Sequence, residues 1–131
     1  QGITLPDQRY AQYLKGCDFI QRYIFPGSCV PSLGAINEAV RQRTDLKMVD
    51  LEDIAPHYAE TLRRWRDNFN AHREDIRALG YPERFIRLWN YYFCYCEAGF
   101  DERYLSDLQI VLTRPKWRGE VPRRLGNGSS F

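Results

Sequence analysis

Aromatic rings are unusually dense between residues 89 and 95, where the sequence reads WNYYFCY. The negative face of such a ring stabilises a nearby positive charge by ~0.5–2 kcal/mol. A buried tyrosine hydroxyl also needs a hydrogen-bond partner, which a bound ligand can supply. Rings on all sides of one helix cannot all face one ligand, so most of them must pack in the core. The stretch predicts a ring-lined pocket, a densely packed core, or a core that is continuous with such a pocket.

Glu83 is a candidate acid–base residue upstream of these rings. Nine residues separate it from Tyr92, which places the two on opposite faces of a straight helix at ~3.6 residues per turn. Glu83 also falls in the first helical turn, where a carboxylate favours the helix dipole, with Arg87 as its i+4 partner. A structural role is therefore at least as well supported as a catalytic one.

The four cysteines stand at positions 17, 29, 94 and 96. Cys94 and Cys96 match no zinc or CxxC spacing, and on a helix their side chains point apart. We expect ordinary buried thiols in a reducing compartment and no metal site. His72 is predicted to lie at the edge of an apolar helical stripe.

These residues are positioned by an alternation of expected strands and helices. Strands are expected at 2–5, 46–51 and 105–113, and helices at 10–24, 31–43, 58–79 and 82–98. The alternation predicts an α/β sheet protein. Three strands make a small sheet, so we expect further strands before Gln1.

Length and composition are sufficient for one domain, and Pro115 ends the final expected strand, so residues 116–131 are predicted to form a basic, flexible tail. The chain has 131 residues, is 44% hydrophobic and carries a net charge of +2. No secretory signal or membrane-spanning run is visible, so the sequence predicts a soluble, cytoplasmic protein. The tail's basic residues could contact anionic lipid or nucleic acid, or could only keep it solvated.

Four separated motifs resemble the C-terminal third of the cyclopropane-fatty-acyl-phospholipid synthase family, which includes the mycolic acid cyclopropane synthases. They read YIFPGSCVPS, PHYAETLRRWRDNF, YPERFIRLWNYYFCYCEAGF and LQIVLTRP, and they cover residues 1 to about 115. The resemblance implies the C-terminal portion of a Rossmann-like S-adenosylmethionine-dependent methyltransferase fold, with a helical acyl-pocket insert and the last strands of the sheet.

The resemblance implies methyl transfer to a cis double bond of a phospholipid acyl chain. Bicarbonate then removes a proton from the added methyl group, and the cyclopropane ring closes. Tyr92 would donate its hydroxyl hydrogen to bicarbonate, and Glu83 matches a glutamate near the site; plain core and helix-capping roles remain the alternatives. Gln1 and the Ile3 backbone align with the bicarbonate-binding strand end, although Gln1 cannot act as a base.

The acyl pocket implied by the resemblance would be lined by Tyr23, Phe25, Tyr58 and Trp89. The apolar turn at Pro26 and Gly27 would then face an apolar tunnel for the acyl chain, with Tyr23, Phe25 and Val30 packed inward. Core filling alone is an equal alternative for Tyr23 and Ile24. His57 is expected to be structural or pocket-lining.

No GxGxxG turn is present in the sequence, so the cofactor site is expected upstream. The isolated chain should then bind neither S-adenosylmethionine nor any other cofactor well, and should not catalyse. Expected partners are phospholipid acyl chains, the inner membrane face as a peripheral surface, and an N-terminal cofactor-binding half; whether it forms a homodimer stays open.

Two other classes of function use different parts of the sequence. A non-catalytic lipid- or membrane-surface-binding module would use the arginines of the 58–79 helix, although acidic residues interleave with them. A nucleic-acid-binding protein would use the helix within 32–43, but residues 1–113 carry a net negative charge, which argues against it.

Overall fold

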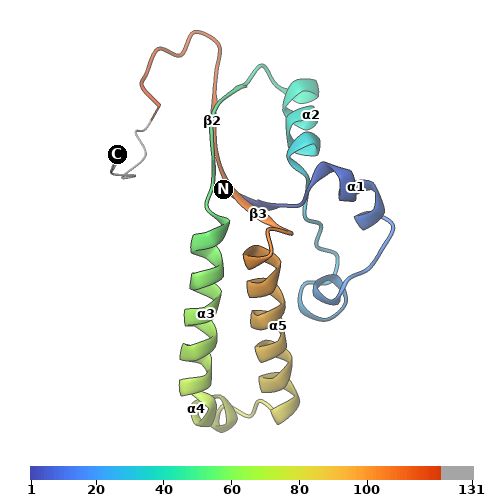
Figure 1. The fold of residues 1–131 in the computed structure, drawn as a ribbon, viewed down its shortest axis with the longest axis vertical. Coiled ribbons are helices and arrows are strands. Elements are labelled where there is room, and N and C mark those ends of the chain that lie inside the picture. Colours follow the sequence, from blue (N-terminus) through green and yellow to red (C-terminus); the bar gives the residue numbers. More distant parts are fainter. Residues whose placement is uncertain (122–131) are drawn as a thin grey trace.

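The computed structural model describes residues 1–121 and confirms the predicted α/β class (Figure 1). The elements in chain order are β1 (Gly2–Thr4), α1 (Asp7–Tyr13), a short π-helix (Ile20–Ile24), α2 (Leu33–Arg43), β2 (Lys47–Asp53), α3 (Ala55–Ala71), α4 (Arg73–Ala78), α5 (Glu83–Asp101) and β3 (Ser106–Thr113). Residues 122–131, which hold most of the predicted tail, lie outside the described residues.

β3 is the central strand of the sheet and pairs antiparallel with both β1 and β2. β1 and β2 therefore run parallel to each other. In this register Ile3 lies opposite Asp107, and Gly2 lies opposite Leu108. The pairing brings the first residues of the chain against its last strand, which no local sequence pattern could reveal.

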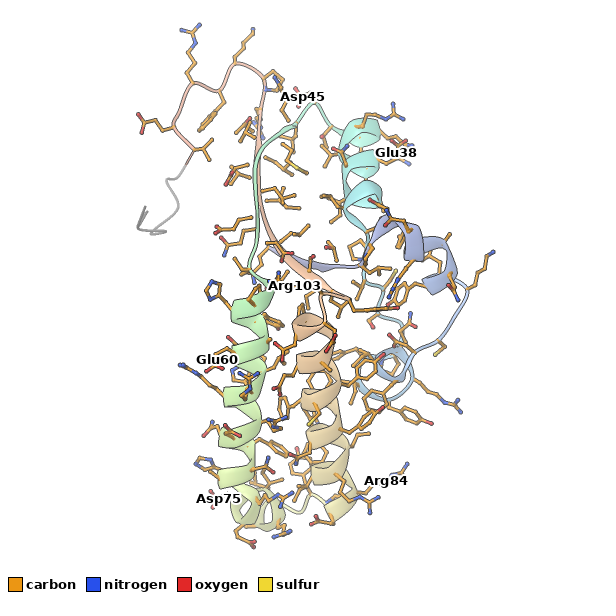
Figure 2. The ribbon with its side chains drawn as sticks, in the orientation of Figure 1. Glu38, Asp45, Glu60, Asp75, Arg84 and Arg103 are labelled. Atoms are coloured by element: carbon orange, nitrogen blue, oxygen red, sulfur yellow. The ribbon has the colours of Figure 1, made fainter. Side chains whose placement is uncertain are left out.

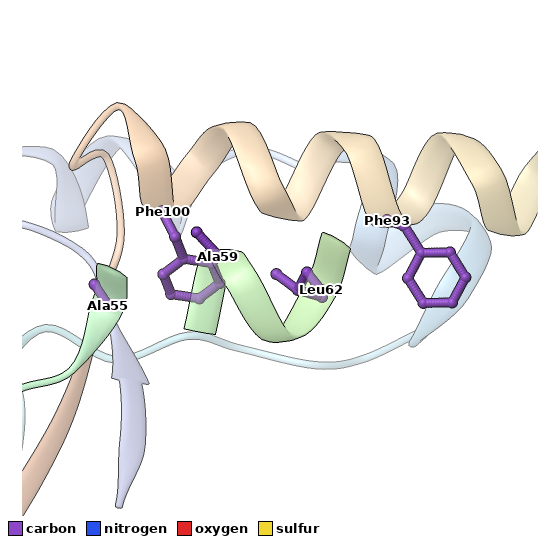
Figure 3. Close-up of a cluster of buried hydrophobic side chains, with 5 residues drawn as sticks. All are labelled: Ala55, Ala59, Leu62, Phe93 and Phe100. Carbon is purple, nitrogen blue, oxygen red and sulfur yellow. The ribbon is translucent and has the colours of Figure 1, made fainter. Parts of the chain in front are cut away.

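α3 and α5 lie side by side and extend from one end of the sheet (Figure 1). The buried core between them is built from small residues of α3 and large rings of α5 (Figure 3): Ala55, Ala59 and Leu62 face Phe93 and Phe100. The alanines let the two helices approach, and each buried phenylalanine contributes roughly 1.5–3 kcal/mol to stability. Because this contact occupies one face of α5, the rest of the chain can pack only on the other faces of that helix.

A partly buried ion pair also joins these two helices. The Glu97 carboxylate on α5 accepts a hydrogen bond from Arg63 Nε at 2.9 Å and forms an ion pair with Arg66 Nη1 at 2.8 Å, both from α3. The Glu97 side chain is only 13% exposed, so this pair is shielded from water more than a surface pair is. The α3-facing side of α5 therefore combines apolar packing with a fixed carboxylate.

The single helix predicted over residues 10–24 is wrong. α1 ends at Tyr13, and the chain turns through Gly16 before the π-helix begins at Ile20. The new start is fixed by a reciprocal cap, in which Gln21 N donates to Asp18 Oδ1 at 2.8 Å and Asp18 N donates to Gln21 Oε1 at 2.9 Å. The spacing Asp-x-x-Gln is a capping-box pattern that was readable in the sequence.

The long helix predicted to end at Gly80 is divided in two. α3 ends at Ala71, and α4 begins at Arg73, because His72 has a non-helical backbone and its Nδ1 lies 2.9 Å from the Asn68 carbonyl oxygen. Gly80 has a φ of +88° and follows the end of α4, which confirms its predicted role as a cap.

Candidate functional site

Tyr92 lies in a group of aromatic rings on α5 and is half-buried against the core between α3 and α5. The Trp89 ring packs edge-on against it with centroids 5.2 Å apart, and the Phe25 ring does the same from the 19–25 segment at 6.0 Å. The apolar turn at Pro26 and Gly27 therefore carries an aromatic ring to Tyr92. Gly27, with a φ of +81°, supplies the backbone conformation that this turn needs.

The predicted pocket-lining residues differ in burial. Tyr58 and Trp89 are half-buried, whereas Tyr23 and Phe25 are 51% and 49% exposed. The expectation that Tyr23 and Phe25 pack inward is therefore wrong, because about half of each side chain is exposed. Tyr23 contacts Phe19 at 5.7 Å, which in turn packs on Tyr91.

The Tyr92 hydroxyl stays protonated at any physiological pH. Burial raises its pKa well above the usual range, and Cys96 and Tyr58 act in the same direction. Burial also raises the pKa of the Cys96 thiol to about 11, although the hydrogen bond with Tyr92 partly opposes this. Tyr92 is therefore a neutral donor, and Cys96 is no thiolate nucleophile.

A small cavity lies where β1 meets β3 and the start of α3. Its volume is about 270 Å³, and its lining consists of Gln1, Gly2, Ile3, Tyr58 and Asp107. The Gln1 side-chain amide donates to Asp107 Oδ2 at 2.7 Å. The structure thus brings together Gln1, Ile3 and Tyr58, which the sequence predicted to be functional residues.

Tyr58 connects this cavity to Tyr92. Burial raises the pKa of the Tyr58 hydroxyl, and the charges of Asp107 and then of Cys96 add to the effect. The Tyr92 hydroxyl is hydrogen-bonded to the Cys96 thiol and is near enough to Tyr58 for the two hydroxyls to influence each other electrostatically. We call Gln1, Tyr58, Tyr92, Cys96 and Asp107 together the polar cluster.

Asp107 is the member of the polar cluster that sequence reasoning missed. It is only 1% exposed, and it lies next to Leu108 within the strand stretch LSDLQIVLT. A carboxylate buried in a strand is costly unless it has a partner, so its position was itself a signal.

Glu83 lies apart from the polar cluster. It begins α5 at the end of the helical hairpin remote from the sheet, near Asp75 and Arg84 in Figure 2. Nine residues of α-helix separate it from Tyr92 by ~13 Å along the axis. Its carboxylate accepts Arg77 Nη2 at 2.8 Å rather than the predicted partner Arg87, so the geometry gives it a structural position at the turn between α4 and α5.

The arginines proposed for a lipid-binding surface are largely engaged in ion pairs. The pairs within the described residues are Arg63 with Glu60, Glu97 and Asp101, Arg64 with Glu60, Arg66 with Glu97, and Arg77 with Glu74 and Glu83. Paired arginines leave little net field at the helix surface, which weakens this alternative.

The prediction of buried cysteines is largely wrong. Cys17, Cys29 and Cys94 are exposed, and Cys96 is half-buried. Across residues 1–121 no group of three or more histidine, cysteine or acidic side chains is arranged to hold a metal ion. Within the same range no helix is long and apolar enough to cross a membrane.

A second, larger cavity of about 560 Å³ lies between α1, the π-helix and the turn after α5. The Arg9 guanidinium stacks over the Tyr104 ring at 4.3 Å on its wall. Asp18 also lines this cavity.

The two small molecules implied by the resemblance fit the described residues poorly. Gln1, expected to hold bicarbonate, already donates its amide to Asp107, whose negative charge would repel a second anion. For S-adenosylmethionine, neither cavity contains a glycine-rich turn of the kind that approaches a nucleotide cofactor.

Comparison with known proteins supports the family resemblance. The chain is 44% identical to the tuberculostearic acid methyltransferase UfaA1 of Mycobacterium tuberculosis over 114 residues, which are 87% of this chain and 27% of that protein. It is 33% identical to the cyclopropane-fatty-acyl-phospholipid synthase of Escherichia coli K12 over 96 residues, which are 73% of this chain and 24% of that protein. The chain therefore spans about a quarter of the length of these relatives.

Two solved structures share the fold. The cyclopropane synthase MmaA2 of Mycobacterium tuberculosis matches with a TM-score of 0.72 at 24% identity, over 84% of this chain and 41% of that one. The mycolic acid cyclopropane synthase CmaA1 complexed with SAH and CTAB matches with a TM-score of 0.70 at 24% identity, over 85% of this chain and 41% of that one.

The family described as mycolic acid cyclopropane synthetase matches residues 1–110 of this sequence. This range ends close to the limit of about 115 that the four sequence motifs indicate. Since the match covers most of the sequence, the chain belongs to the mycolic acid cyclopropane synthetase family.

Proposed function

We propose that this chain forms the acyl-binding side of a methyltransferase that transfers a methyl or methylene group to a cis double bond of phospholipid acyl chains. The observation that carries the proposal is the placement of Tyr92 between the rings of Trp89 and Phe25, next to the polar cluster. Rings of this kind stabilise positive charge that water cannot reach. Both a ring-forming and a methyl-branching outcome are compatible with this arrangement.

The relatives' names support the same class of reaction, since they include a fatty-acid methyltransferase and a cyclopropane synthase. S-adenosylmethionine would supply the methyl group. Because the sequence has no GxGxxG turn, we propose that residues outside this sequence bind it and that the chain alone is inactive.

Tyr92 is the residue of this chain that we propose to be catalytic. Its hydroxyl remains protonated, and we propose that it donates a hydrogen bond to the anion that accepts the proton released from the methylated chain. Glu83 has no part in this proposal, since its carboxylate is paired with Arg77 at the remote end of α5. Phe25, Trp89, Tyr23 and Tyr58 would line the path of the acyl chain.

The test is methyl transfer by the natural protein that contains this chain. Radiolabelled S-adenosylmethionine is incubated with vesicles of a monounsaturated phospholipid, and label in the lipid is counted. Tyr92→Phe should lower the rate about 10–100-fold, because a hydrogen bond to a charged group contributes about 1.5–3 kcal/mol. Tyr91→Phe is the matched control, since Tyr91 is exposed and packs on Phe19 instead.

Fully saturated vesicles are the control for the lipid and should receive no label. Equal labelling of saturated lipid, or no labelling of either lipid, would contradict the proposed reaction. Vesicle binding without any methyl transfer would instead favour the non-catalytic lipid-binding module.

A further inference from the structure

We propose that the carboxylate of Asp107, supplied by the chain itself, takes the place of bicarbonate as the proton acceptor of this site. The inference rests on the proposed function and adds a catalytic residue to it. It starts from the disagreement between the expected bicarbonate site and the side chains that are present there.

The first step is that the Gln1 side chain already has a hydrogen-bond partner within the chain. Its side-chain amide Nε2 donates to Asp107 Oδ2 at 2.7 Å, a short distance typical of a hydrogen bond to a charged acceptor. Glutamine has no positive charge with which to hold two anions. The group that the family resemblance assigns to bicarbonate is therefore already engaged with a carboxylate of the chain.

The second step is the fixed position of Asp107. Its backbone N–H donates to Asp53 Oδ1 at 3.2 Å, and its carbonyl oxygen accepts from Ile54 N at 2.8 Å. On its other side it is paired with Ile3 of β1. These contacts hold the carboxylate in place without a bound ligand, so the acceptor is organised before substrate arrives.

The third step is the surroundings of the carboxylate. Asp107 is 1% exposed, yet it lines the cavity of about 270 Å³ together with Tyr58. Its Oδ2 is the oxygen that accepts from Gln1. The almost fully buried carboxylate therefore borders the cavity that Gln1, Ile3 and Tyr58 also line.

The chemistry balances with Asp107 as the acceptor. Transfer of the methyl group to one carbon of the double bond converts S-adenosylmethionine to S-adenosylhomocysteine and leaves a carbocation on the other carbon. The carboxylate then takes one proton from the cationic acyl chain, and the C–H bond that breaks gives its electron pair to the cation. That pair closes a cyclopropane ring or forms a double bond, and Asp107 ends as a carboxylic acid that returns its proton to water.

The first test removes bicarbonate from the natural protein that contains this chain. Methyl transfer to monounsaturated vesicles is measured in buffer purged of carbon dioxide, with and without added bicarbonate. We expect the wild-type rate to be the same in both. A wild-type rate that falls at least tenfold without bicarbonate would overturn the inference while leaving the proposed function intact.

Two substitutions then separate the charge of Asp107 from its volume. Asp107→Ala should lose about 10²–10⁴-fold in rate without bicarbonate, the usual contribution of a proton acceptor, and added bicarbonate or formate should restore part of it. Asp107→Asn should lose as much without being restored, because its amide still fills the position. Asp45→Asn, in the exposed turn between α2 and β2, is the matched control and should keep the wild-type rate (Figure 2).

A binding measurement provides a readout that needs no catalysis. ¹³C-labelled bicarbonate is titrated while the side-chain amide signals of the protein are followed by NMR. The Gln1 amide should shift in Asp107→Ala and stay unchanged in the wild-type protein. A shift of the Gln1 amide in the wild-type protein, or an Asp107→Ala variant that stays fully active without bicarbonate, would overturn the inference.

Failure of the proposed function has its own signature in the same experiments. A wild-type protein that transfers no methyl group in any buffer would contradict both the proposed function and the role of Asp107 in it. The bicarbonate titration would still show whether Asp107 blocks the anion site.

Discussion

The two sides of α5 differ in how completely they are packed. On the side facing α3, Phe93 and Phe100 are buried and Glu97 is held by two arginines. On the other side, rings from residues 19–25 cover the helix only partly, and Tyr91 and Tyr95 remain 55% and 40% exposed.

The difference shows how one helix can serve stability and function at the same time. A closed face resists substitution, because every atom removed leaves a cavity. A half-covered aromatic face can admit an apolar ligand, because the exposed ring faces still have surface to bury. Tyr92 lies between the two sides, because its ring contacts both Phe93 of the core and Phe25 of the covering segment.

The largest effect is expected on the closed side. Phe100→Ala should lower the free energy of unfolding by about 3–5 kcal/mol, because the ring is 1% exposed and packs against Tyr58 with centroids 4.9 Å apart. Denaturant unfolding followed by circular dichroism measures the loss. Tyr91→Ala on the half-covered side is the comparison, and an equal loss there would remove the distinction between the two sides.

Thiol reactivity distinguishes two cysteines that lie two residues apart on α5. Cys94 is exposed beside Arg66 Nη1 at 3.1 Å, whereas burial raises the pKa of the Cys96 thiol to about 11. Only the thiolate reacts with iodoacetamide, and a pKa of about 11 leaves Cys96 almost entirely in the unreactive thiol form at pH 8. At pH 8 we therefore expect the exposed Cys94 to be alkylated much faster than Cys96.

Peptide mass spectrometry after timed alkylation measures the two rates. Raising the pH toward 11 should speed the reaction of Cys96, because its thiolate fraction rises over that range. Equal rates for both cysteines at pH 8 would show that the Tyr92 side of α5 is open to water.

The smallest effect is expected for the stability of Tyr92→Phe. The hydroxyl is hydrogen-bonded to the thiol of Cys96, a weak partner, so its removal should change the unfolding free energy by less than ~1 kcal/mol. The same variant should lose methyl transfer about 10–100-fold. Parallel losses of stability and activity would instead assign Tyr92 to the core.

The order of strands and helices was predictable because it depends on local patterns. The helix from Leu33 to Arg43 begins where its cap predicts, with Ser32 Oγ accepting from Ala35 N at 3.1 Å. The wrong helix bounds occurred at Gly16 and His72. At each position the helix breaks for a few residues only, and the apolar residues on both sides continue the helical spacing across the break. The Asp18 capping box was the signal that could have located the first of them.

Parts of the candidate site were predictable and others were not. Tyr92, Tyr58, Gln1 and Ile3 follow from the family motifs, and the structure places them around one polar cluster. Arg77 could not be identified as the partner of Glu83, because that ion pair depends on the turn through Gly80. The exposure of Tyr23 and Phe25 likewise depends on how far their segment covers α5.

The α/β class, the aromatic density of α5 and the family resemblance can be read from the sequence, because these properties depend on residues that are near one another in the chain. The hydrogen bond from the Gln1 amide to Asp107, 106 residues away, is visible in the folded chain alone. It forms because β1 pairs with β3 through backbone hydrogen bonds, which carry no side-chain signature, and the register of that pairing sets which side chains meet.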